Sequence, residues 1–335
     1  MLPITPEPPP AGLFRWMVDI SGWSPGQAEW ALLLSLLPEA DAAKVMRFVH
    51  EVDRKRALVS RLLQRRACVE ATGVAWRDVK IERTKGGKPF MANKPKSMVT
   101  AANWNFNVSH EGLYVGLAAE PLAVCGIDVT EPFEQRVKAK GIAGQISKVG
   151  GELPMEEQLH TFRDQLSSFE KTLIDKCRPD DKKMEHMFRK FWSLKEAFTK
   201  GRGDGLGFEF NRCSFNFVGG DGAGGLSPST AERGTAGQPV ARARVAIDGT
   251  PSKRWQFAVQ ALRAQHFVSV ARGTPDDVVD KVGAFKATFT QVLSPARLQA
   301  ELERPEPPFE PKAVEDIVPL EVRDTYRKLA IQGRT

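Results

Sequence analysis

The pattern of apolar and polar positions divides the chain into helical and strand-like segments. Residues 16–23 are predicted to form a strand that leads into a turn. Residues 28–49 carry apolar side chains at helical spacing, with Pro38 opening a second helix. We expect this second helix to continue through residues 53–73 and to stop at Gly73. Four residues mark its buried stripe: Ala57, Leu58, Leu62 and Cys68.

Strand patterning dominates the middle of the chain. Residues 79–91 are predicted to form two short strands around a Lys-Gly-Gly-Lys-Pro turn. Residues 106–129 contain three β-rich runs separated by two turns, which predicts an antiparallel meander. Residues 133–190 are polar, irregular and helical in character.

A helix over residues 188–200 is predicted next, with its buried face at Phe188, Phe191, Leu194 and Phe198. A strand is expected over residues 208–218, a flexible surface loop over 219–237, and further strands over 242–248, 254–262 and 266–273. The Pro-rich tail beyond residue 273 is expected to be partly ordered at best. Helices and strands mix without a βαβ rhythm, so the predicted class is α+β.

Composition limits the possible classes of protein. Apolar residues make up 41% of the 335 positions and charged residues 27%, as in ordinary globular proteins. No run of 18 apolar residues occurs, and the N-terminus lacks the pattern of a secretion signal, so we expect no membrane partner. The four cysteines are widely spaced, which favours a reducing, cytoplasmic location.

The net charge of +7 is concentrated in one segment. Residues 41–100 contain 15 Lys and Arg against 6 Asp and Glu, an excess of nine positive charges. Such a segment indicates a polyanionic partner, which could be a nucleic acid, a phosphorylated small molecule or an acidic protein. A basic, solvated helix face is the alternative.

Adjacent Ser109 and His110 suggest a serine hydrolase, but neighbouring strand residues point to opposite faces, so His110 cannot readily activate Ser109. Phosphate binding by both side chains suits them better. A histidine bonded only to turn carbonyls is the structural alternative.

Two carboxylates are candidates for metal chemistry. Asp128 stands alone in an apolar strand, where an unpaired charge is costly. Glu196 and Lys200 share a helical stripe with Trp192. Asp128 and Glu196 could bind magnesium, with Lys200 beside them to bind phosphate. The alternative for Glu196 and Lys200 is a surface ion pair that contributes about 0.3–0.5 kcal/mol.

Four glycines follow this helix at every second position, from Gly201 to Gly207. A dinucleotide-binding loop follows a strand and opens a helix, whereas this run follows a helix and precedes a strand. We therefore expect it to end the helix and to form a mobile connector.

In order along the chain, RTKGGKPF, FNVSHEG, GIDV and FWSLKEAFTKGRGDGLGFEF resemble the motifs of phosphopantetheinyl transferases. The resemblance runs from about residue 16 to residue 273. It is strongest to the large, single-chain, surfactin-type class, in particular the aminoadipate-semialdehyde-dehydrogenase type. It implies two similar α+β halves packed as a pseudo-dimer around coenzyme A, with a half at 1–122, a half at 123–275 and the tail at 276–335. It also implies magnesium-dependent transfer of 4′-phosphopantetheine from coenzyme A to a serine of an apo carrier protein, releasing adenosine 3′,5′-bisphosphate.

The resemblance also assigns residues. Glu196, Lys200 and His110 become catalytic, with Glu196, directly or through a water, as the base for the carrier serine. Asp128, Glu196 and Glu111 become magnesium ligands, because Thr130 stands where bacterial relatives have an acid and Glu111 where animal relatives have glutamine. The implied coenzyme contacts are Lys44, Arg56, Arg83, Thr84, Lys85, Gly86, Gly87, Lys88, Asn107, Val108, Ser109, His110, Lys195 and Lys200.

Carrier domains of fatty-acid synthase, polyketide or peptide synthetase, or aminoadipate reductase type are the implied partners of a monomeric enzyme. Carrier choice depends on surface shape, which the sequence does not rank. Two rival hypotheses are a basic nucleic-acid-binding protein and a non-catalytic subunit that binds coenzyme A or a nucleotide. The first leaves Asp128 and Glu196 unexplained and lacks aromatic residues interleaved with the basic ones, so no nucleic-acid partner is expected.

Overall fold

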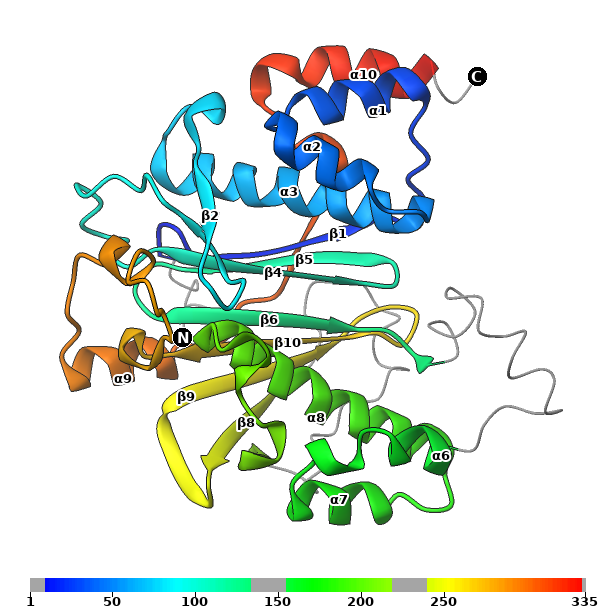
Figure 1. Ribbon diagram of the computed structural model, residues 1–335, viewed down its shortest axis with the longest axis vertical. Coiled ribbons are helices and arrows are strands. Elements are labelled where there is room, and N and C mark those ends of the chain that lie inside the picture. Colours follow the sequence, from blue (N-terminus) through cyan, green and yellow to red (C-terminus); the bar gives the residue numbers. More distant parts are fainter. Residues whose placement is uncertain (1–9, 134–154, 219–239, 333–335) are drawn as a thin grey trace, which may run out of the picture.

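Two β-sheets, each covered by a long helix, form the centre of the molecule (Figure 1). The computed structural model describes residues 10–133, 155–218 and 240–332. The first sheet has the order β11-β1-β5-β4 and the second the order β6-β10-β9-β8-β7. A separate hairpin joins β2 (Ile81–Arg83) to β3 (Pro89–Met91). Mixed helix and sheet confirm the predicted α+β class.

Helix α3 (Glu51–Thr72) covers the first sheet, and α1 (Gln27–Ser35) and α2 (Glu39–Met46) lie on the far side of α3. The four residues of the predicted stripe on α3 are all buried, and Gly73 ends the helix with φ of 70°. The prediction that α2 continues into α3 is wrong. The chain breaks at residues 47–50, where Arg54 donates hydrogen bonds to the main-chain carbonyls of Phe48 and Val49.

The predicted three-stranded meander is wrong for its third strand. β4 (Asn105–Glu111) pairs with β5 (Tyr114–Glu120), and β5 pairs with β1 (Phe14–Asp19). β6 (Val124–Thr130) instead begins the second sheet by pairing with β10 (Phe267–Gly273). Side chains of β4 join the two sheets: Asn105, Asn107 and Ser109 accept hydrogen bonds from the backbone N–H groups of Cys125, Ile127 and Val129.

The second sheet continues through β9 (Thr250–Ala261), β8 (Val240–Ile247) and β7 (Cys213–Val218). Helix α8 (Asp181–Arg202) lies on it, with the predicted face of Phe188, Phe191, Leu194 and Phe198 buried. Two shorter helices, α6 (Met155–His160) and α7 (Ser168–Asp175), pack near its first half. The predicted loop over 219–237 lies outside the described residues.

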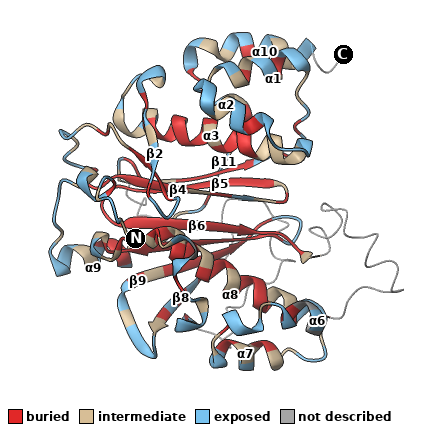
Figure 2. Ribbon diagram, in the orientation of Figure 1, coloured by how far each residue is buried: buried red, intermediate tan, exposed pale blue. Residues whose placement is uncertain are grey.

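Three apolar clusters hold these layers together. One lies between the first sheet and α3, one between the second sheet and α8, and the third between the two sheets. Figure 2 shows the central strands, such as β5 and β6, and parts of both long helices as buried. Among the described residues no helix is both long enough and apolar enough to cross a membrane.

The C-terminal tail is folded, so the expectation of partial order is wrong. It contains α9 (Pro295–Glu303), β11 (Glu310–Lys312) and α10 (Arg323–Gln332), and it returns to the N-terminal half. β11 pairs in parallel with β1, and α10 lies beside α1. Scattered apolar residues anchor the tail, with Phe309, Ile317 and Val318 all buried.

A buried ionic cluster ties the tail to both halves. Arg15 of β1 pairs with Glu120 of β5 and with Glu306 of the tail. Arg272 of β10 lies 3.0 Å from Glu120 and 3.9 Å from Glu306. Two cations and two carboxylates therefore compensate one another, which makes burial of all four tolerable.

Candidate active site

A pocket of about 750 Å³ lies where the two halves meet at the C-terminal end of α8. It combines three of the four segments that the sequence singled out: the β2–β3 turn, strand β4 and helix α8. Eight predicted site residues line it: Arg83, Gly86, Gly87, Lys88, Asn107, Val108, Glu196 and Lys200.

The centre of the site is an ion pair between Lys200 and Asp128. The Lys200 ammonium lies 2.6 Å from Asp128 Oδ1 and 3.1 Å from Ser109 Oγ. Burial opposes its charge, but Asp128, followed by Glu196 and Glu111, outweighs that effect, so the pKa of Lys200 is raised. One fixed cation from α8 is therefore held among carboxylates of both halves.

Those carboxylates are the three predicted magnesium ligands. Their oxygen-only donor set suits a hard cation, and Glu111 Oε2 accepts a hydrogen bond from the backbone of Glu131. Within the described ranges, no group of three or more His, Cys, Asp or Glu side chains is arranged to hold a metal ion. Thr130 is buried and its hydroxyl lacks a hydrogen-bond partner among the described residues.

The predicted basic contacts His110, Arg56 and Lys44 are not among the residues that line the pocket. The side chain of His110 is exposed. The pKa of its imidazole is lowered to about 4, first by desolvation from the protein atoms around the ring and then by the charges of Lys200 and Arg56. Its imidazole is therefore neutral at pH 7. Arg56 donates to the Gly112 carbonyl at 2.8 Å, in the turn that follows His110. Lys44 is exposed, 3.6 Å from Asp41, and lies outside the residues that line the pocket.

The β2–β3 turn inserts between the halves. Thr84 is buried and closes the turn, because its backbone N–H bonds the Lys88 carbonyl and its hydroxyl accepts from Lys88 N–H. Arg83 donates to the Gly87 carbonyl at 2.9 Å, and Lys85 is exposed. Lys88 is buried, and this burial lowers its pKa to about 8.

The glycines around α8 permit close backbone approach, so the prediction of a mobile connector needs correction. A Cβ on Gly86 would lie 2.0 Å from the Gly203 carbonyl oxygen, and one on Gly126 would lie 2.0 Å from the Ala197 carbonyl oxygen. Gly203 also ends α8 with φ of 84°, as predicted for a helix stop. The glycines therefore allow the backbone of α8 and of the residues after it to pack directly against β6 and the β2–β3 turn.

Lys195 is not placed as a coenzyme ligand. Its side chain is fully buried, 2.8 Å from Glu170, and it donates to the carbonyls of Phe210 and Cys213. The physical reason is helical spacing: position 195 follows Phe191 by four residues and precedes Phe198 by three, so it lies on the buried face of α8. This part of the sequence-based assignment is wrong.

The pocket has an aromatic wall that the sequence analysis missed. Phe162, Trp192, Phe208 and Phe210 line it beside the charged residues. The Trp192 ring meets Phe162 edge-on at 5.0 Å and Phe210 at 5.3 Å. Trp192 shares the helical stripe of Glu196 and Lys200, which was the available signal. Phe162 lies in a segment whose pattern is irregular.

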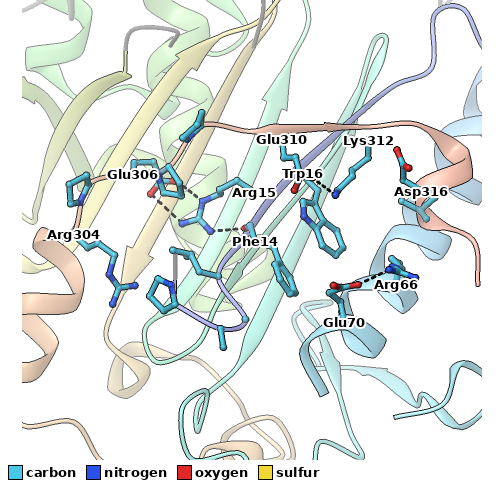
Figure 3. Close-up of a pocket in the computed structure, with 18 residues that line it drawn as sticks. Phe14, Arg15, Trp16, Arg66, Glu70, Arg304, Glu306, Glu310, Lys312 and Asp316 are labelled. Carbon is cyan, nitrogen blue, oxygen red and sulfur yellow. Dashed lines mark hydrogen bonds and ion pairs between the residues drawn. The ribbon is translucent and has the colours of Figure 1, made fainter. Parts of the chain in front are cut away.

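A larger groove of about 1150 Å³ lies on the other side of the first sheet, between β1, α3 and the tail (Figure 3). Its charged side chains are engaged locally: Arg66 pairs with Glu70, Lys312 with Glu310, and Arg15 with Glu306. The chemistry-bearing residues of the sequence motifs lie in the smaller pocket.

Fold and pocket together are typical of a group-transfer site: a cleft where the two helix-covered sheets meet, basic at one turn, with Glu196 beside Lys200, and aromatic along one wall. Comparison with known proteins agrees with this class. Residues 21–122 match the family described as "4′-phosphopantetheinyl transferase, N-terminal", and residues 124–223 match the "4′-phosphopantetheinyl transferase superfamily".

Individual relatives extend the match. The chain is 31% identical over 263 residues to the L-aminoadipate-semialdehyde dehydrogenase-phosphopantetheinyl transferases of Rattus norvegicus and Homo sapiens, covering 78% of this chain and 75% of theirs. It is 30% identical to a phosphopantetheinyl transferase of a Thraustochytrium strain, over 78% of this chain and 79% of that one. The chain therefore belongs to the 4′-phosphopantetheinyl transferase family. It is an enzyme that transfers phosphopantetheine to carrier proteins.

Proposed function

We propose that the pocket at the end of α8 binds coenzyme A and presents its pyrophosphate to the serine of an apo carrier protein, with adenosine 3′,5′-bisphosphate as the released product. The observation that carries this proposal is the Lys200–Asp128 pair, because Lys200 lines a pocket built from both halves together with Glu196. A fixed cation and carboxylates at one point suit phosphoryl transfer, in which positioning and charge stabilisation do most of the work.

The two walls of the pocket divide coenzyme A between them. The nucleotide and its phosphates face the basic turn at Arg83–Gly87 and the β4 segment, and Lys44, Arg56 and His110 add positive or polar groups from outside the pocket lining. The thiol-bearing arm lies along the aromatic wall. Lys200 contacts the phosphates directly, and each such charge-assisted contact contributes about 1.5–3 kcal/mol.

Glu196 is the base in this proposal. Its side chain is one helical turn before Lys200 and lines the same pocket. The carrier hydroxyl gives its proton to the Glu196 carboxylate as its oxygen bonds to the β-phosphorus, and the bond from that phosphorus to the bisphosphate oxygen breaks. Lys200 then faces the negative charge that develops on the leaving group.

Magnesium belongs to the same proposal. Asp128 and Glu196 would hold the ion and Glu111 would complete the donor set, because all three lie within electrostatic reach of one ammonium group. When bound, magnesium supplies charge neutralisation at the pyrophosphate. Binding of manganese as a paramagnetic substitute, followed by spin resonance with wild-type and Asp128→Asn protein, tests the site without an activity assay.

The test of function is incubation of the protein with coenzyme A, magnesium and several apo carrier domains, followed by intact-mass measurement. Addition of one phosphopantetheine group to a carrier is expected. Glu196→Gln is expected to bind coenzyme A and to lower the transfer rate by about 100-fold or more, in line with the loss of a positioned base. Unchanged transfer by this variant would contradict the role of Glu196.

The relatives' names suggest an aminoadipate-semialdehyde dehydrogenase carrier among the acceptors, and we propose it as the first carrier to assay, before fatty-acid, polyketide and peptide synthetase carriers. The matching layout of the halves, a 22-residue helix on a mainly antiparallel sheet in each, supports a pseudo-dimeric monomer. All four cysteines are free thiols, which is compatible with the proposed cytoplasmic location.

A further inference from the structure

Lys88 differs from the other basic residues of the β2–β3 turn. It is only 3% exposed, and its ammonium group is directed into the protein between two main-chain carbonyls. Nζ donates to the Cys125 carbonyl at 2.6 Å and to the Lys200 carbonyl at 3.1 Å. The first carbonyl belongs to β6 and the second to the last turn of α8.

These two carbonyls stand close to the reactive pair. Asp128 is on β6, three residues after Cys125, and Lys200 supplies both the accepting carbonyl and the ammonium that binds Asp128. Carbonyls in the last turn of a helix have no partner within the helix, and a cation is stabilising there. One ammonium group thus ties the strand of Asp128 to the helix of Lys200.

The backbone of the turn reinforces this link. Gly86 packs directly on the Gly203 carbonyl, and Gly205 packs on Gly86, so the turn also contacts the residues that follow the end of α8. Residues 83 and 86–88 of this hairpin also line the pocket, together with residues of α8. The turn therefore contacts both the proposed nucleotide subsite and the catalytic helix.

We infer that Lys88 is a positioning residue for phosphopantetheine transfer, which fixes the separation of Asp128 and Lys200 through their backbones and does not bind a phosphate of coenzyme A. The inference rests on the proposed function for its kinetic consequence. It replaces the contact with coenzyme A that the family resemblance implied for this residue.

Lys88→Met keeps the length of the side chain and removes its donors. Because a misplacement of about 1 Å can cost about 100-fold in rate, kcat is expected to fall by about 10- to 100-fold. KM and the calorimetric dissociation constant for coenzyme A are expected to stay within about threefold, since no phosphate contact is lost. Lys80→Met removes an exposed lysine just before the same hairpin and is expected to leave all three quantities unchanged.

Hydrogen exchange supplies a readout that does not depend on activity. In Lys88→Met, amides in the last turn of α8 are expected to exchange faster, while those of its first half keep their protection. Lys88→Gln, which retains one donor group, is expected to be intermediate in kcat and exchange, and it serves if the Met variant does not fold.

A dissociation constant for coenzyme A that rises tenfold or more with unchanged kcat would make Lys88 a phosphate ligand and overturn the inference. A fall in stability alone, with kcat and exchange of the α8 terminus unchanged, would also overturn it. If wild-type protein binds coenzyme A but modifies no carrier, the proposed function fails, and the exchange measurement still decides whether Lys88 holds α8 in place.

Discussion

Replacing Gly126 by alanine tests whether the seating of α8 on β6 sets the geometry of the site. The added Cβ would lie 2.0 Å from the Ala197 carbonyl oxygen, 2.4 Å from the Gly201 nitrogen and 2.8 Å from its Cα. All three are backbone atoms of α8, so no side chain can move aside. Non-bonded atoms rarely approach a Cβ closer than 3.0 Å, and strand and helix must therefore separate by about 1 Å.

That separation acts directly on the chemistry. Ala197 and Gly201 are the neighbours of Glu196 and Lys200, whereas Asp128 lies two residues beyond Gly126. A 1 Å change between them is expected to lower kcat by about 100-fold. Overpacking is expected to reduce the free energy of unfolding by about 1–3 kcal/mol.

The assay combines steady-state carrier modification at saturating coenzyme A with urea unfolding. Gly207→Ala is the matched control, because it lies in the same glycine run, has no atom within 4 Å of its added Cβ and shows no positive φ. It is expected to keep wild-type kcat within twofold. If Gly126→Ala retained kcat within threefold and lost less than about 0.5 kcal/mol, the claim that this contact sets the active-site geometry would be refuted.

Two further predictions concern stability. Lys195→Met leaves Glu170 buried without its cation, so the free energy of unfolding should fall by about 3–5 kcal/mol while affinity for coenzyme A is kept. The Lys195→Met/Glu170→Gln double variant is the control and should recover stability. A loss of affinity for coenzyme A without a loss of stability would contradict the structural role of Lys195. Desolvation by burial, the largest cause for each, lowers the pKa of His186 and of His266 to about 4. The folded state therefore binds fewer protons than the unfolded state between pH 6.5 and 4, and stability should fall as the pH drops through that window. Urea unfolding midpoints at pH 7 and pH 5 measure this loss of stability. The loss between the two pH values should be smaller in His266→Phe than in the wild type.

Local patterns in the sequence predicted the long helices well. Apolar residues at steps of three and four identified the buried faces of α3 and α8, and a glycine in the left-handed region ends each of them. The break between α2 and α3 was missed because apolar spacing continues through it. The chain leaves the helix there since Arg54 satisfies the free carbonyls of Phe48 and Val49, a contact that periodicity does not encode.

The partners of each strand could not be read from the same patterns. β4, β5 and β6 follow one another with short turns, as in a meander, but β6 joins another sheet. The reason lies in alternate residues of β4: side chains of Asn105, Asn107 and Ser109 take up the N–H groups that a main-chain ladder would otherwise satisfy. In the sequence, Asn107 and Ser109 suggested ligand contacts.

At the site, the motifs located the pocket but did not assign every side chain. Glu196 and Lys200 do line it, and Asp128 of β6 pairs with Lys200 of α8 within the second half. Lys195 and Lys88 instead have buried ammonium groups bonded to protein carbonyls. A lysine in a basic motif can thus either bind a ligand or stabilise the fold. Its position on a helix face or within a turn distinguishes the two roles.

The return of the tail to β1 has a consequence for the order in which the protein can fold as it is made. Arg15 and Glu306, which pair inside the molecule, are separated by 291 positions in the chain. At a synthesis rate of about 5–20 residues per second, the first strand waits on the order of 15–60 s for its outer neighbour. During that time the edge of β1 is open to other chains. A ribosome-bound chain ending before residue 304 is thus the form most exposed to mispairing, and the arrival of the tail completes the first sheet.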